Sequence, residues 1–424
     1  MYLAFLILNL LLVGISHFVF KKWINPVSFY SLIWLFIVTG FEIKLLQYNP
    51  LSYITWLVII SFQLSFVLGC FMGYKTSSKD SNAFKNSEAD FSCGINYCTS
   101  IRRAILVLSL ISSIGIIPNL YNLIAKYGTN ILASSALIYY DRLTGGRGFE
   151  LIPYLGAVSH VAVIFSGIYI SKYGFKLFTI IPITLLIANI LPTGGRMDLL
   201  YGILYIIIPV AISKNRLQFK RSQKIFITAL LLVLIGIILT ISNVRSIQKA
   251  PPMYMNHTME KLYEKSPVIP SIYLYLTAPI GVLNKYLEEP DYRFGGNSFG
   301  IFYSILNKLG VEIEYNRYQE ALPIPMYVNV GSYIREVIQD FTYIGILVVF
   351  IWGSIFGATF KKFQTRESLT ANTFVVIFFI STFMSFYMWS FREPAFWIIC
   401  FVGLITSQIT DRRNLLHSKN RIRQ

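Results

Sequence analysis

Eleven apolar runs, each of a length that crosses a lipid bilayer as a helix, account for about half of this 424-residue chain. Hydrophobic residues make up 55% of the chain and charged residues only 13%, a balance that is unusual for a soluble domain. The sequence therefore predicts an all-α polytopic membrane protein with about 11 transmembrane helices. We expect these helices at about residues 2–20, 27–45, 53–73, 104–123, 151–171, 177–193, 197–213, 225–243, 337–359, 371–389 and 395–410.

The placement of lysine and arginine predicts how these helices are oriented. Of the 37 Lys and Arg residues, 22 lie in alternate short connections, at 21–22, 75–103, 172–176, 214–224, 361–366 and 412–423. Of the other 15, nine lie in one long connection at 244–340, which leaves six for the opposite side. Because cytoplasmic loops are enriched in Lys and Arg, we expect the N-terminus outside and the C-terminus in the cytoplasm. Lys21 and Lys22 follow the first apolar run rather than precede it, so this run is predicted to be an uncleaved span.

The chain is accordingly predicted to have three segments. Residues 1–243 form transmembrane helices one to eight, residues 244–334 form a large extracytoplasmic loop, and residues 335–424 form helices nine to eleven with a basic cytoplasmic tail. Within the loop, apolar segments at 268–287 and 299–309 are expected to lie at the outer membrane interface. We expect Pro270, Pro279 and Gly281 to break the first of these. A long loop between short connections usually has a function.

The net charge of +17 does not indicate a nucleic-acid-binding protein, because the basic residues occur in small groups between apolar runs. The loop has no cysteine, and a lone histidine on an apolar helix, His160, is more often a packed core residue than a functional one. Tyrosines are frequent in the loop, where they can stack on sugars or anchor at the interface.

Arginines at the outer helix ends suggest a ligand. A guanidinium keeps its charge and donates two hydrogen bonds to phosphate oxygens, so several of them around an outward-facing cleft would bind a lipid-linked pyrophosphate. The alternative is that such arginines only reach lipid headgroups, and we favour this alternative for Arg142, Arg293 and Arg317. The arginines predicted to bind pyrophosphate, each within about one turn of a spanning helix, are Arg196, Arg245, Arg335 and Arg392.

Two carboxylates lie beside one of these arginines. Glu336 and Asp340 are four residues apart and share one helix face, with Arg335 about 100° away around the axis. This arrangement places a candidate base beside a cation, so Arg335, Glu336 and Asp340 are the predicted catalytic residues. The alternative is the ordinary preference for acidic residues in a first helical turn. No histidine or Asp-x-Asp pair adjoins them, so we expect neither a metal nor another cofactor.

Short motifs in these regions resemble a known family. They are Leu191-Pro192-Thr193-Gly194-Gly195-Arg196 before one apolar helix, and Pro323-Ile324-Pro325, Asn329-Val330-Gly331 and Asp340-Phe341…Gly345 before another. In these motifs and in the arrangement of most of its length, the chain resembles the bacterial oligosaccharide repeat-unit polymerases, the Wzy-type O-antigen and capsular polysaccharide polymerases. The resemblance implies a GT-C-like membrane glycosyltransferase of the bacterial plasma (inner) membrane.

That family transfers a growing glycan from undecaprenyl pyrophosphate to a lipid-linked oligosaccharide repeat unit at the outer face of the membrane. The resemblance implies that Arg196, Arg245 and Arg335 stabilise the pyrophosphate leaving group, and that no soluble nucleotide sugar is needed. It also implies membrane lipid, a chain-length regulator and a flippase as partners. Two alternatives remain at this point: an O-antigen-type ligase, which uses the same donor with another acceptor, and a flippase or other transporter of lipid-linked oligosaccharide.

Overall fold

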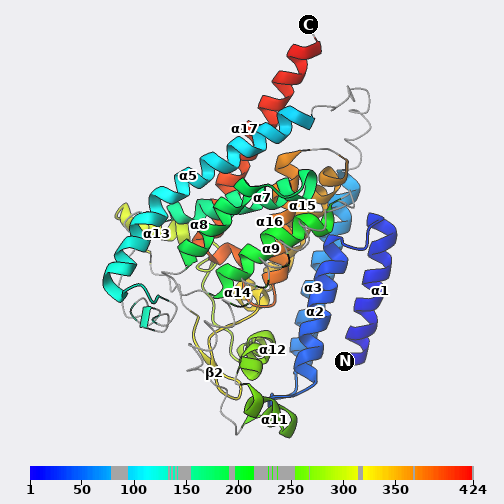
Figure 1. Ribbon diagram of the computed structural model, residues 1–424. Helices are drawn as coiled ribbons and strands as arrows, with labels where there is room; N and C mark the ends of the chain where they lie inside the picture. Colours follow the sequence, from blue (N-terminus) through cyan, green and yellow to red (C-terminus); the bar gives the residue numbers. More distant parts are fainter. Residues whose placement is uncertain are drawn as a thin grey trace. The chain divides into compact units, whose positions relative to one another are not determined.

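The computed structural model describes residues 1–77, 94–131, 154–190, 196–213, 254–266, 268–313, 319–365 and 368–422, with a few isolated positions between 134 and 236. Nearly all of the secondary structure in these ranges is helical (Figure 1). The one sheet among them is a two-stranded antiparallel hairpin, β1 (Leu322–Pro323) and β2 (Tyr327–Val328), with Leu322 opposite Val328. The all-α class predicted from the sequence is thus confirmed.

Among the described residues, six helical segments are long and apolar enough to cross a membrane: Tyr2–Phe20, Tyr53–Thr76, Tyr97–Tyr127, Leu155–Tyr173, Tyr333–Thr365 and Pro394–Arg413. Shorter apolar helices occupy Pro26–Glu42, Leu177–Ile190, Leu199–Ile212 and Leu369–Met384. These positions match ten of the predicted apolar runs. The eleventh, at 225–243, lies almost wholly outside the described residues, so the count of 11 spans stays a prediction.

The chain forms two compact units. Unit 1 comprises Met1–Ala83, Gln248–Thr365 and Ser381–Phe396, and unit 2 comprises Phe84–Ile247, Arg366–Ile380 and Trp397–Gln424. The compact units therefore follow a different division of the chain from the three sequential segments expected from the sequence. Two helices, α16 (Leu369–Met384) and α17 (Pro394–Ile422), have residues in both units.

The described part of unit 2 is built from apolar helices that pack on one another. They are α5 (Gly94–Tyr127), α7 (Val158–Tyr173), α8 (Ile181–Ile190) and α9 (Arg196–Ile212), with α7 in contact with the other three. Residues Val158 to Ser171 of α7 are all buried, which makes it the central helix of this group. His160 lies on this helix with its Nδ1 3.3 Å from the Tyr205 hydroxyl, in agreement with the packed-core interpretation of this residue.

Unit 1 begins with three helices, α1 (Tyr2–Phe20), α2 (Pro26–Glu42) and α3 (Tyr53–Thr76), which are blue in Figure 1. Asn25 starts α2 as a capping box: its side chain accepts hydrogen bonds from the backbone of Val27 and Ser28 at 3.0 and 2.9 Å. Pro26 follows at the first helical position, where a missing N–H leaves no bond unmade.

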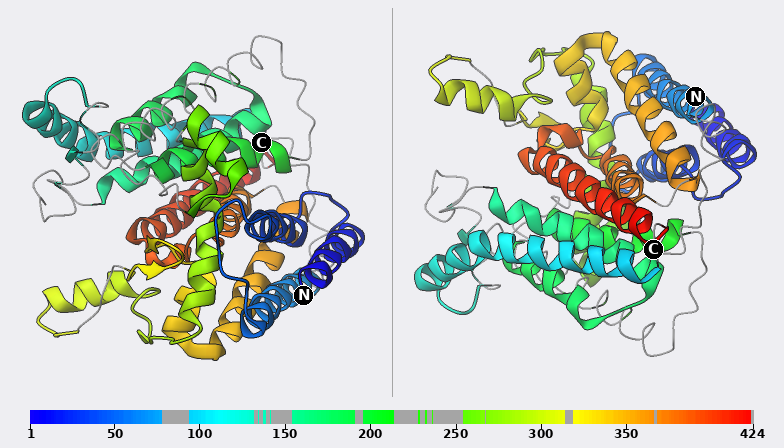
Figure 2. Two further views of the ribbon diagram at one scale, coloured as in Figure 1. Left: turned by 90° about the horizontal axis from the view of Figure 1, so that it is seen from below. Right: turned by 90° about the horizontal axis from the view of Figure 1, so that it is seen from above.

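Small residues bring α3 against α15 (Gly345–Thr365), the helix that is orange in Figure 2. A Cβ atom added at Gly73 would lie 1.9 Å from the Ser354 carbonyl oxygen, and one at Gly357 would lie 2.1 Å from that of Cys70. Each of these glycines belongs to a Gly-x-x-x-Gly pair, with Gly69 and Gly353. The two backbones therefore touch, which is how such pairs join helices in membranes.

The remaining elements of unit 1 come from the long loop and the segment after it. They are α11 (His257–Lys265), α12 (Val268–Tyr286), α13 (Gly300–Lys308), the β1–β2 hairpin, α14 (Tyr333–Phe341) and the 3-10 turn η5 (Thr342–Ile344) that leads into α15.

Helices are present at both predicted interfacial segments. α12, however, is continuous, so the expectation that Pro270, Pro279 and Gly281 break it was wrong. Pro270 lies in the first turn, where helices tolerate proline. Pro279 lies inside α12 and is buried, and contacts with neighbouring elements let the helix continue through it.

The apolar run predicted as one span from residue 337 is interrupted. α14 ends at Phe341. The next residue, Thr342, adopts φ 55° and ψ −149°, which lies outside the α-helical region and ends the helix. Gly345 then starts α15 so close to α14 that an added Cβ would lie 2.5 Å from Cγ1 of Val337. The Asp340-Phe341…Gly345 motif therefore marks a sharp break between two helices.

Candidate functional site

The short helix α14 is the structural centre of the candidate site. Every residue from Tyr333 to Asp340 is buried, which is unusual for a helix that carries Arg335, Glu336, Gln339 and Asp340. Its first turn is fixed by a hydrogen bond from the Tyr333 backbone N–H to the Ser385 carbonyl, at 2.9 Å. The polar side chains of α14 therefore must find partners inside the protein, because water does not reach them.

One face of α14 carries the two carboxylates. Glu336 accepts a hydrogen bond from the Trp389 backbone N–H at 2.7 Å and forms an ion pair with Arg392 at 2.6 Å. The Arg392 side chain is 19% exposed and that of Glu336 is fully buried. Burial alone would lower the pKa of Arg392, but the adjacent Glu336 carboxylate outweighs burial, so the pKa is raised. Arg392 thus stays charged and neutralises a buried acid.

Asp340, one turn further along, is surrounded by donors. Its carboxylate accepts hydrogen bonds from the backbone N–H groups of Asn297 and Ser298, at 2.9 and 2.6 Å. The Asn297 amide and the Ser298 hydroxyl donate two more, at 3.0 and 2.6 Å. Trp389 Nε1 donates to the same hydroxyl at 3.0 Å and so links Asp340 to the segment that holds Glu336. Asp340 therefore attaches the loop before α13 to α14.

Arg335 lies on an adjacent face, and the carboxylates of Asp291 and Glu336 act on it only at a distance longer than that of an ion pair. Its side chain is 1% exposed, yet it forms no ion pair with a carboxylate of a described residue. Its two terminal nitrogens lie 3.4 and 3.3 Å from the Glu320 carbonyl oxygen, which makes weak hydrogen bonds, and its Nε has no partner among the described residues. The guanidinium lies over the Tyr286 ring, 5.4 Å from its centroid.

Such a group is costly. Burying a cation without an ion pair and without good hydrogen bonds costs several kcal/mol, and a bound anion would offset part of this cost. Gly331 allows the guanidinium stem to take this position, because a Cβ there would lie 2.6 Å from Cδ of Arg335. The Asn329-Val330-Gly331 motif thus has a structural role beside the arginine.

Amide side chains complete the surroundings of Arg335. Gln339, one turn after it, donates to both carboxylate oxygens of Asp291 at 2.7 and 2.9 Å. Gln319 donates to Gln339 at 2.8 Å and to Asn297 at 2.9 Å, and its own amide oxygen is buried with no partner in the part of the chain that the structure describes. The described part of the site therefore offers a guanidinium without an ion pair and one amide oxygen, that of Gln319, without a partner, a combination suited to an anionic, hydroxyl-rich ligand.

The structure brings together some of the predicted site residues and leaves others unplaced. Arg335, Glu336, Asp340 and Arg392 all lie on α14 or in contact with a residue of α14. Arg196 begins α9 in unit 2, and Arg245 lies outside the described residues, as do Arg142 and Arg317. The grouping of four outer arginines around one cleft thus stays a prediction.

Sequence reasoning missed the amide residues. Gln339 could have been found, since it follows Arg335 by four residues and therefore shares its helix face. Asn297, Ser298 and Gln319 sit in loops far from α14 in sequence, and no periodicity marks them. Among the described residues, no group of three His, Cys, Asp or Glu side chains could hold a metal ion.

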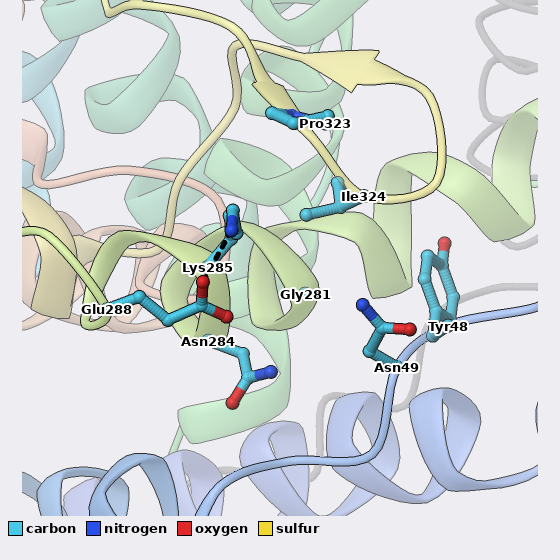
Figure 3. A pocket seen from close by; sticks show the side chains of 8 residues that line it. All are labelled: Tyr48, Asn49, Gly281, Asn284, Lys285, Glu288, Pro323 and Ile324. Atoms are coloured by element: carbon cyan, nitrogen blue, oxygen red, sulfur yellow. Dashed lines mark hydrogen bonds and ion pairs between the residues drawn. The ribbon is translucent and has the colours of Figure 1, made fainter.

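A small pocket lies elsewhere in unit 1, between the segment after α2, helix α12 and the hairpin (Figure 3). Figure 3 shows Asn49 and Tyr48 on one side of it, with Pro323 and Ile324 on the hairpin. Its cation, Lys285, is already paired with Glu288, and Asn284 accepts hydrogen bonds from Ser52 and Thr55. The charges and amides of this pocket are thus better compensated than those around Arg335.

Comparison with known proteins gives no match, whether to a family model, to a curated protein or to a solved structure.

Proposed function

We propose that this protein is a membrane glycosyltransferase that polymerises lipid-linked oligosaccharide repeat units at the outer face of a bacterial plasma membrane. In this proposal the donor is a growing glycan on undecaprenyl pyrophosphate, and the acceptor is a second lipid-linked repeat unit. The product is an O-antigen or capsular polysaccharide. The N-terminus is outside, and the C-terminus is cytoplasmic.

The observation that carries the proposal is the buried guanidinium of Arg335, which forms no ion pair within the part of the chain that the structure describes. A diphosphate leaving group supplies the anionic oxygens that Arg335 lacks, and a guanidinium can bind two of them at once. The helix helps, because Arg335 lies in the first turn of α14, where the helix dipole also favours an anion. Amide groups such as Gln319 and Gln339 suit the hydroxyls of the attached sugars.

The reaction is a displacement at the anomeric carbon of the donor sugar. The acceptor hydroxyl oxygen forms the new bond to that carbon, the bond from the carbon to the pyrophosphate oxygen breaks, and the hydroxyl proton passes to a base. The negative charge that develops on the pyrophosphate is stabilised by Arg335, with Arg392 and, by the sequence argument, Arg196 and Arg245 as further contributors.

The ion pair between Glu336 and Arg392 gives Glu336 a way to act as the base. While Arg392 is bound to it, Glu336 is a poor proton acceptor, since the cation stabilises its charged form. If pyrophosphate draws Arg392 away, Glu336 is released beside the acceptor. Asp340 is held by four hydrogen bonds and fits better as a positioning residue that holds the loop.

Reconstitution tests the proposal. The purified protein is placed in vesicles that contain only undecaprenyl-pyrophosphate-linked repeat units, and the products are separated by size. A polymerase makes a ladder of chain lengths from this single substrate. A ligase needs a different acceptor and makes none, and a flippase moves the substrate across the bilayer without extending it. Unextended substrate under these conditions would refute the proposed function.

A further inference from the structure

Helix α13 has an apolar face that none of the described residues covers. None of its nine residues is buried, and both views in Figure 2 show it, in yellow-green, at the edge of unit 1. Its large apolar residues recur at the spacing of one helix face and are all exposed: Phe302 44%, Ile305 49%, Leu306 36% and Leu309, just after the helix, 75%. Exposed apolar faces of this kind mark an interaction surface.

The loop before α13 extends the same surface. Phe294 is 74% exposed and Phe299 is 40% exposed. This loop is tied firmly to the protein: Tyr303 donates to the Phe294 carbonyl at 3.0 Å, and Asn297 and Ser298 bind Asp340. The apolar side chains are thus held outward by an anchored backbone.

This surface continues into that of a membrane-spanning segment. The Phe299 ring contacts the Phe341 ring at the end of α14, with centroids 6.2 Å apart. Beyond Phe341, exposed apolar residues follow one face of η5 and α15: Ile344 69%, Leu347 56%, Ile351 50% and Ile355 51%. Their spacing of three and four residues is that of one helix face turned toward lipid.

Charge indicates the kind of partner. Between Phe299 and Leu309 the only charged residue is Lys308, at the C-terminal end of α13 and fully on the surface. An apolar face with a lysine and no acidic residue fits the boundary between the acyl chains and the phosphate headgroups of a bilayer.

We propose that α13 lies in the surface of the lipid bilayer, with Ile305, Leu306 and Leu309 among the acyl chains and Lys308 at the phosphates. The loop before α13 binds Asp340 on α14 and forms one side of the buried polar site. The bilayer then holds this loop in place through α13. The inference holds independently of the glycan-transfer proposal, since it depends only on the exposed surface and its continuity with α15.

Photo-crosslinking of the full chain in nanodiscs of phosphatidylethanolamine and phosphatidylglycerol tests this inference. The variants are Ile305→p-benzoylphenylalanine and, as the control on the opposite, polar face, Asn307→p-benzoylphenylalanine, about 160° away around the helix axis and also exposed. Leu347→p-benzoylphenylalanine on α15 serves as the positive control. Adducts are identified by mass spectrometry.

We expect phospholipid adducts at residue 305 in a yield comparable with residue 347 and several-fold above residue 307. Adducts at 305 to a second copy of the chain, or to another segment of the same chain, would overturn the proposal. So would an absence of adducts at 305 when residue 347 crosslinks to lipid, because the face would then be turned to water.

Discussion

At the scale of single residues, the ion pair between Glu336 and Arg392 holds together two segments that are 56 residues apart in the chain. The variant Glu336→Gln retains an acceptor for the Trp389 N–H but leaves Arg392 without its counter-charge. Losing one partner of a buried pair costs about 3 kcal/mol. We expect a clear fall in the thermal unfolding temperature of the purified protein.

The matched control is the double variant Glu336→Gln with Arg392→Gln, which removes both charges. It should recover part of the lost stability, because no uncompensated charge remains. Equal unfolding temperatures for the wild type and the single variant would show that the pair does not stabilise the protein.

Gly331 allows Arg335 to take its place. In Gly331→Ala the new methyl group would lie 2.6 Å from Cδ of Arg335, so the guanidinium must move. We expect chain extension to fall at least about tenfold while folding is retained, since displacement of a binding group by about 1 Å is costly. Gly14→Ala is the control, because a Cβ at Gly14 meets no atom within 4 Å. Equal ladder synthesis by both variants would refute this role of Gly331.

At the scale of elements, the loop from Asp291 to Phe299 is fastened to α14 at its first half by Gln339, whose carbonyl accepts from the Arg293 N–H at 2.6 Å, and at Asn297 and Ser298 by Asp340. The variant Asp340→Asn loses the charge that strengthens four hydrogen bonds, which we expect to cost about 2 kcal/mol locally. Hydrogen–deuterium exchange of residues 294–299 should then speed up at least about tenfold. Glu288→Gln, at an exposed position, should leave the exchange unchanged. Unaltered exchange in Asp340→Asn would show that other contacts hold the loop.

The contact between α3 and α15 depends on glycine. In Gly357→Leu the side chain would meet the backbone of Cys70, because even a Cβ lies 2.1 Å from its carbonyl oxygen. The helices must separate, at a cost of about 3 kcal/mol or more. A lowered unfolding temperature is expected, with Gly14→Leu as a control that changes it little. An unchanged unfolding temperature in Gly357→Leu would mean that the helices do not meet there.

The elements themselves were largely predictable, because the length of an apolar run follows directly from the thickness of a bilayer. The break at Thr342 was not, since Tyr343 and Ile344 continue the apolar pattern and only the backbone reveals the turn. Of the site, the sequence indicated Arg335, Glu336, Asp340 and Arg392 from their places at helix ends. Their partners Asn297 and Ser298 could not be predicted, because tertiary contacts between distant loops leave no periodic signal.

At the scale of the whole molecule, the distribution of basic residues predicts opposite sides for the two termini. Fusions of alkaline phosphatase and of green fluorescent protein to the C-terminus should give fluorescence and no phosphatase activity, because the predicted C-terminus is cytoplasmic. The same reporters placed after residue 287 should give the reverse result, since the long loop is predicted to be outside. Phosphatase activity at the C-terminus would overturn its predicted cytoplasmic position. With the N-terminus outside, it would also contradict the odd number of spans.

The most direct test of the central claim is ladder synthesis by Arg335→Ala in vesicles that hold only lipid-linked repeat units. Removing a group that stabilises the leaving pyrophosphate should reduce extension about a hundredfold or more, and Arg335→Lys should restore it only in part, because an ammonium lacks the planar pair of donors. Lys265→Ala, an exposed cation of the same loop, should make ladders as the wild type does. Full ladders from Arg335→Ala in correctly inserted protein would contradict the account.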